Sequence, residues 1–154
     1  MKWKSLILAV AVFFSSLFAI TGAHAQDLQM AGATDIGMLY VDTAKTGTLY
    51  KDGAAFLTVH AEEMYTDQTF LAELQKDKDL KKVIGAAHLY LFDNKGSSYC
   101  VAASYLFDAQ GKVCLDYGSD MRMKKLTSKD KTMLNAYTLC LKALENKKRF
   151  QKKF

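Results

Sequence analysis

Alternating apolar and polar positions dominate the middle of the chain and predict an antiparallel β-sheet. Residues 38–41 form a short apolar run that is typical of a first strand. Asp52-Gly53 is a strong turn signal between residues 43–51, which favour a short strand or turn, and residues 54–61, in which the two faces alternate. We therefore expect a hairpin around this turn.

A repeated motif predicts three further strands. The pattern Tyr-Leu-Phe-Asp-x-x-Gly begins at Tyr90 and again at Tyr105. In each copy an apolar run ends in a turn, where the Asp side chain accepts backbone hydrogen bonds and Gly supplies a positive φ. The two turns connect a meander of strands over residues 83–92, 97–107 and 112–117.

Two segments have helical spacing. Residues 67–82 are expected to form a middle helix, started by Thr66 or Asp67 and weakened by the charges that follow Leu74. Thr127-x-x-Asp130 resembles a capping box and opens a C-terminal helix. Its apolar stripe consists of Met133, Leu134, Ala136, Tyr137, Cys140, Leu141, Ala143 and Leu144.

The expected fold class is therefore α+β. It combines a curved antiparallel sheet of about five or six strands, largely a meander, with a C-terminal helix packed on one face and a short middle helix. The chain contains no proline and no internal linker. We expect a single α+β domain over residues 37–146, preceded by a flexible leader over residues 26–36 and followed by a basic tail over residues 147–154.

The N-terminus is typical of a secretory signal peptide over residues 1–25. Two lysines near the start precede an apolar run over residues 6–20, and Ala23 and Ala25 give a small-residue cleavage pattern. The run of about 15 residues is shorter than the ~20 that span a membrane. We expect cleavage after Ala25 and export; an uncleaved anchor is the alternative.

Charge is concentrated at the C-terminus. Loss of Lys2 and Lys4 with the signal segment leaves 19 of the 21 basic side chains against 16 acidic ones. Five of the basic side chains fall in the last eight residues: Lys147, Lys148, Arg149, Lys152 and Lys153. The rest is slightly acidic, so no nucleic-acid partner is expected. The tail could attract an anionic surface weakly; a solvated, frayed end is the alternative.

The three cysteines, Cys100, Cys114 and Cys140, suggest a disulfide, since export leads to an oxidising compartment. A regular hairpin would place Cys100 and Cys114 roughly 17–20 Å apart, beyond the ~7 Å that a bridge allows. A Cys100–Cys140 bond would instead tie the last helix to the sheet. Cys114 would then be left over.

Motifs for catalysis or metal binding are missing. His60 and His88 lie on different expected strands, and no metal-ligand spacing surrounds them. There is no glycine-rich phosphate loop and no nucleophile elbow, and Ser104 is interpreted as a packing residue. We therefore expect no catalytic residue, no metal and no cofactor.

An aromatic sheet face is the one binding-site hypothesis. If the face of Cys100 meets the C-terminal helix, the other face carries Tyr99, Tyr105 and Phe107. Such a face must be covered by the middle helix, by a second subunit in a homodimer, or by a ligand. A ligand would make these three aromatics a binding surface.

The order of several motifs resembles the surface-adhesin protein E family of Gram-negative bacteria. The features are the strand end Tyr40-Val41-Asp42, Cys100 beside a strand that continues into residues 105–113, and a segment led by Ser128 that carries Cys140. The match covers most of residues 38–141. The resemblance implies a helix laid on an antiparallel sheet and joined to it through Cys100 and Cys140. Residues 67–82 and Cys114 are additional to the family pattern.

The resemblance also implies the function. We expect an exported, non-enzymatic binding protein of the envelope or cell surface, whose partner is a host or envelope macromolecule. A periplasmic interaction or inhibitor module without an adhesin role is the alternative. A small hydrolase is a third hypothesis, which no motif supports.

Overall fold

The computed structural model describes residues 27–152, and the expected signal peptide and Lys153 lie outside them. The elements in chain order are β1 (Leu28–Ala33), β2 (Gly37–Asp42), the 3-10 helix η1 (Thr43–Lys45), β3 (Gly47–Lys51), β4 (Ala54–Tyr65), α2 (Gln68–Leu74), the 3-10 helix η2 (Lys78–Leu80), β5 (Val83–Asp93), β6 (Ser98–Asp108), β7 (Val113–Lys125) and α3 (Lys131–Gln151).

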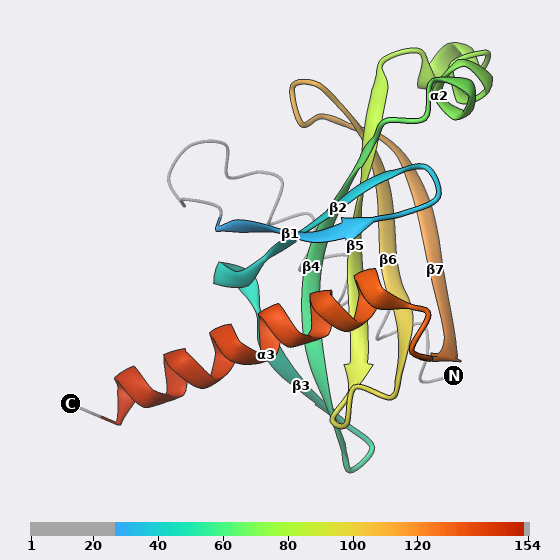
Figure 1. Ribbon diagram of the computed structural model, residues 1–154. Coiled ribbons are helices and arrows are strands. Elements are labelled where there is room, and N and C mark those ends of the chain that lie inside the picture. Colours follow the sequence, from blue (N-terminus) through green and yellow to red (C-terminus); the bar gives the residue numbers. More distant parts are fainter. Residues whose placement is uncertain (1–26, 153–154) are drawn as a thin grey trace.

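These strands form one antiparallel, seven-stranded sheet with α3 lying across it (Figure 1). The order is β1-β2-β4-β5-β6-β7, and β3 pairs separately with β4. The expected α+β class, with a C-terminal helix on the sheet and a short middle helix, is confirmed.

The expected turns are confirmed because they depend on local chemistry. Asp93 and Asp108 each accept two backbone N–H groups at 2.8–3.1 Å. Gly96 and Gly111 close these turns with φ of 65° and 75°. The β3–β4 hairpin turns at Asp52-Gly53, where both residues have positive φ.

The expected flexible leader is wrong for most of its length, since residues 28–33 form β1. This edge strand pairs with β2 through a turn in which the Thr34 hydroxyl accepts the N–H of Gly37 at 3.0 Å. A Cβ at Gly32 would lie 2.7 Å from the hydroxyl oxygen of Thr132 on α3. Glycine there lets the helix pack close to the strand, and Ala31 is buried in the same cluster as Ala136 of α3.

Both helices differ from their expected ranges. α2 ends at Leu74, before the charged segment, and the Asp67 side chain caps its start as expected. α3 starts at Lys131 rather than Thr127. The N–H and hydroxyl of Thr127 both donate to the Asp130 carboxylate at 2.7 Å, which forms a turn before the helix.

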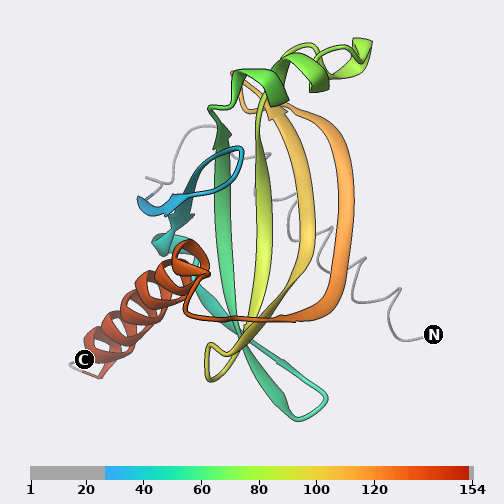
Figure 2. The ribbon, with the colours of Figure 1, turned by 45° about the vertical axis from the view of Figure 1, so that its right-hand side comes forward.

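The basic tail expected from residue 147 is mostly helical. α3 continues to Gln151, so its last turns extend beyond the sheet (Figure 2). Lys147 donates to the backbone oxygens of Ala44 and Thr46, at 2.6 and 3.3 Å, and this holds the helix against η1.

The two faces of the sheet carry separate apolar clusters. The face that meets α3, here called the helix face, includes Val59, Phe92 and Tyr90, packed with Ala136 and Cys140 of the helix. On the opposite face lie Leu89, Leu91, Cys100, Ala102 and Phe107, with other apolar side chains around them. α3 packs against β1, β2, β4 and η1.

A bulge in β6 changes which residues share a face. Tyr90 pairs with Val101 and Leu89 pairs with Ala103, so Ala102 is an extra residue. Val101 therefore lies on the helix face, and after the bulge Ser104 lies on that face too, opposite His88.

The cysteine prediction fails for this reason. Cys100 belongs to the cluster on the opposite face, whereas Cys140 is a residue of α3 and packs against the helix face. The strand residues that face the helix are Tyr99 and Val101, the neighbours of Cys100. All three cysteines are free, and burial raises the pKa of the Cys100 and Cys140 thiols.

Candidate functional site

The three aromatic residues expected to form a binding surface do not lie together. Tyr99 packs on the helix face, where its ring stacks on Phe92 with centroids 5.5 Å apart. Tyr105 and Phe107 follow the bulge and belong to the cluster on the opposite face. The structure therefore gives no single patch of these side chains.

A chain of polar side chains instead interrupts the helix face. The Ser104 hydroxyl lies 2.7 Å from Nδ1 of His88, and Nε2 of His88 lies 3.4 Å from a carboxylate oxygen of Glu63. The hydroxyl of Thr34, in the β1–β2 turn, donates to the other oxygen of Glu63. We call Thr34, Glu63, His88 and Ser104 the polar cluster.

The polar cluster is largely removed from solvent. Ser104 is 6 % exposed, and the side chains of His88 and Glu63 are 14 % and 12 % exposed. Burial by itself would raise the pKa of Glu63, but hydrogen bonds from His88 and Thr34 outweigh it and bring that pKa below its ordinary value. Glu63 is therefore a carboxylate at neutral pH.

The carboxylate determines how His88 is oriented. A negative charge facing Nε2 favours the tautomer with its proton on Nε2, which leaves Nδ1 as the acceptor for the Ser104 hydroxyl. The imidazole also stacks on Tyr90, with centroids 5.3 Å apart. Burial, and then the charge of Glu63, raise the pKa of Tyr90, which keeps this phenol neutral.

The edge strand β7 lies beside the Ser104 end of the polar cluster and carries exposed positions. Ser104 is paired with Gly118, and a Cβ at Gly118 would have nothing within 4 Å. On the same strand Leu115 is 41 % and Tyr117 is 73 % exposed. The end of the chain of hydrogen bonds at Ser104 thus lies beside an open part of the edge strand.

From the sequence, Ser104 is interpreted as a packing residue and no motif is found around His88. Their contact depends on the extra residue Ala102, because a regular β6 would place Ala103 opposite His88. One signal in the sequence could have indicated the polar cluster. Glu63, His88 and Ser104 are polar residues on strands whose other residues on this face are mostly apolar.

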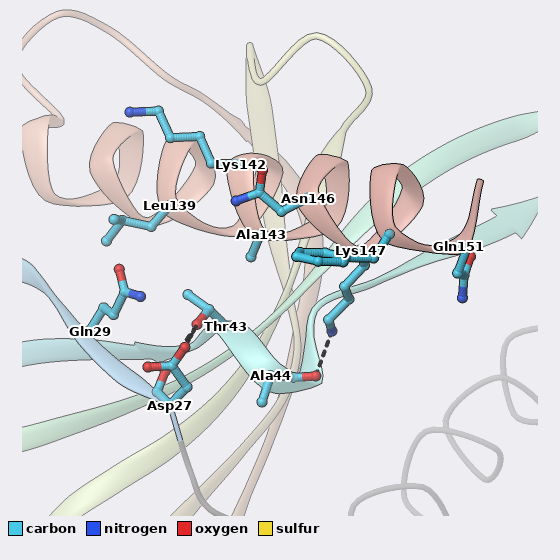
Figure 3. A pocket seen from close by; sticks show the side chains of 11 residues that line it. Asp27, Gln29, Thr43, Ala44, Leu139, Lys142, Ala143, Asn146, Lys147 and Gln151 are labelled. Atoms are coloured by element: carbon cyan, nitrogen blue, oxygen red, sulfur yellow. Dashed lines mark hydrogen bonds between the residues drawn. The ribbon is translucent and has the colours of Figure 1, made fainter. Parts of the chain in front are cut away.

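A groove of about 670 Å³ runs between the C-terminal half of α3 and the β1–η1 edge (Figure 3). On its η1 side Thr43 donates to the Asp27 carboxylate at 2.8 Å, and Lys147 reaches the Ala44 carbonyl. The lining residues on α3 are Leu139, Lys142, Ala143, Asn146, Lys147, Phe150 and Gln151.

The positive charge around the groove comes from α3, whereas Asp27 contributes a carboxylate on the other side. The helix carries five basic side chains and one acidic one, Glu145. Phe150 is 67 % exposed on the part of the helix beyond the sheet. The groove therefore combines small apolar side chains with basic side chains on its outer rim.

His60 and His88 cannot share a metal, because they are on different faces of the sheet. His88 is on the helix face, and His60 lies on the opposite face, buried near Asp42 and Lys45. Burial, and then the charge of Lys45, lower the pKa of His60 to about 4, so it is neutral at pH 7. Within residues 27–152 no group of three metal-ligating side chains is present.

Comparisons of the chain with protein-family models, with curated proteins and with solved structures gave no match. In the part of the chain that the structure describes, no helix is long and apolar enough to cross a membrane.

Proposed function

We propose that this chain is an exported binding protein of the bacterial envelope or cell surface, of the surface-adhesin E type. Its ligand would be a host or envelope macromolecule held in the groove between α3 and the β1–η1 edge. The observation that supports this proposal is the groove itself, which has a volume of about 670 Å³. Pockets of about 300–1,000 Å³ are the usual size for bound groups.

The charges of α3 favour an acidic ligand. Lys142, Lys148 and Arg149 are exposed, and the single acid of the helix is Glu145. Basic side chains near an anionic surface contribute about 1 kcal/mol each. An acidic polysaccharide or another acidic macromolecule could therefore lie along the helix and place an apolar group against Leu139 and Ala143.

The groove is preorganised on its η1 side. Lys147 is held by two backbone carbonyls, and Thr43 is held by Asp27. Side chains that are already fixed lose less conformational entropy when a ligand binds. The groove would thus accept a ligand without rearrangement of η1.

Heparin is a suitable acidic probe for this proposal. The chain from residue 26 onwards should bind it in a salt-dependent way, and the double variant Lys142→Glu/Arg149→Glu should lower the affinity by about tenfold or more. The matched control is Lys81→Glu/Lys82→Glu, which makes the same charge change at exposed positions after η2. Equal affinities of the two double variants would refute the groove as the site.

The location of the protein separates the adhesin from the periplasmic alternative. Protease or antibody access on intact cells, compared with osmotically opened cells, should show the protein at the surface if the adhesin proposal holds. Access only after opening would favour a periplasmic interaction or inhibitor module, and cross-linking would then be used to find its envelope partner.

A further inference from the structure

The polar cluster is costly to keep in an apolar sheet face. Buried polar groups reduce stability unless they are well hydrogen-bonded, and the contact from Nε2 of His88 to Glu63 is long, at 3.4 Å. Apolar side chains fill the neighbouring positions on the same strands, such as Tyr90 and Leu106. Local exceptions to apolar patterning are typical of functional sites.

The order of groups is the one that activates a hydroxyl. Glu63 faces one nitrogen of His88, and the Ser104 hydroxyl oxygen lies 2.7 Å from the other nitrogen. A nucleophile, a base within hydrogen-bond reach and a third group that orients the base form the general pattern of nucleophilic catalysis. Here the hydroxyl meets Nδ1 rather than Nε2, and in the tautomer with its proton on Nε2 the basic nitrogen is Nδ1.

Two backbone features orient this hydroxyl and leave space in the neighbouring strand. The bulge at Ala102 turns Ser104 toward His88, and bulges commonly re-aim side chains next to active sites. On β7, Gly118 pairs with Ser104, and the space that a side chain at this position would occupy is open. Since Ser104 is only 6 % exposed, a reactant would have to reach it through this space beside Gly118.

We propose that Ser104 is a nucleophile activated by His88, with Glu63 as its positioning residue, and that it takes the acyl group of small activated esters. The Ser104 oxygen forms a bond to the acyl carbon while His88 Nδ1 takes the hydroxyl proton. The ester C–O bond then breaks, and the leaving oxygen receives that proton. Water, deprotonated by the same nitrogen, releases the acid and restores the hydroxyl. This activity is separate from binding in the groove, which the reaction does not use.

A fluorophosphonate probe tests the nucleophile directly. The serine oxygen displaces fluoride at phosphorus, and peptide mapping locates the adduct. We expect the adduct on Ser104 in the folded chain, none in Ser104→Ala, and a rate about a hundredfold lower in His88→Gln. Ser128→Ala, an exposed serine in the turn before α3, is the matched control and should label like the original chain.

A second pair of variants tests the positioning role of Glu63. Glu63→Gln should slow labelling, and Glu63→Asp, which keeps the charge, should recover most of the rate; a purely structural role predicts no such rescue. No adduct on the folded original chain, an adduct on another residue, or full labelling of His88→Gln would each overturn the proposal. The first outcome decides even if a variant fails to fold. Heparin binding is measured on the same samples, so failure of one proposal is distinguished from failure of the other.

Discussion

The helix face has two regions that follow different rules. Under α3 the sheet contributes Val59 and Phe92, which are fully buried in one apolar cluster with Ala136 of the helix. Toward the end that carries α2, the same face contributes Glu63 and His88, with low exposure but polar partners. Low exposure alone therefore does not make a position apolar. What matters is whether the neighbours can satisfy hydrogen bonds.

The largest expected loss of stability comes from a substitution in the apolar region. Phe92 is 0 % exposed, stacks on Tyr99 and lies 5.5 Å from the ring of Tyr137. Phe92→Ala should lower the free energy of unfolding by about 3–5 kcal/mol, because it leaves a cavity between sheet and helix. Denaturant unfolding measures this. Phe150→Ala, at an exposed position of α3, should change stability by about 0.5 kcal/mol or less; equal costs would contradict the description of the two sites.

The second effect concerns His60, a buried polar residue on the opposite face of the sheet. The pKa of His60 is lowered to about 4 in the fold and returns to 6.5 on unfolding. The unfolded chain thus binds the extra proton, so stability is lost as pH falls from about 6.5 to 4, by up to about 3 kcal/mol. Denaturant unfolding from pH 7 to pH 4.5 should show this fall. His60→Gln should flatten the curve, and an unchanged slope would contradict it.

A smaller effect tests the polar region. Thr34→Val keeps the shape of the side chain but removes the hydroxyl that donates to Glu63. Loss of a hydrogen bond to a charged group should cost about 1–3 kcal/mol. Since the pKa of Glu63 is lowered in the fold, the contribution of its charge is present above pH 4.5 and is lost as pH falls through the folded value. Thr48→Val, at an exposed strand position, is the control and should be near neutral.

The smallest effect is at the end of α3. Lys147→Met keeps the aliphatic stem but removes the two hydrogen bonds to η1, and we expect a loss of about 0.5–1.5 kcal/mol. Lys148→Met, on the exposed side of the same turn, should change thermal unfolding little. Equal shifts would show that the helix end is not held at η1.

Local signals predicted much of the fold. The Asp-x-x-Gly turns at Asp93 and Asp108, the Asp52-Gly53 hairpin and the apolar stripe of α3 all depend on neighbours in sequence. β1 was missed because its small residues gain order only from pairing with β2 and packing under α3.

The polar cluster was missed because it depends on pairing across strands. Whether Ser104 or Ala103 lies opposite His88 is determined by one extra residue, Ala102, and no local pattern indicates it. The same uncertainty of one residue produced the wrong pairing of Cys100 with Cys140. An error in strand parity therefore affected the cysteines and the binding aromatics together.

β7 has a consequence for self-association. It is 13 residues long, and no other strand of residues 27–152 pairs with its outer edge, so it offers a row of backbone donors and acceptors to any passing extended chain. The sequence of β7 opposes the pairing of another chain with this edge. Gly118 adopts a φ of 88°, which distorts the strand, and Asp116, Asp120 and Arg122 place both signs of charge along it. Neutralising these charges should therefore favour edge-to-edge association of β7 strands from different copies of the chain.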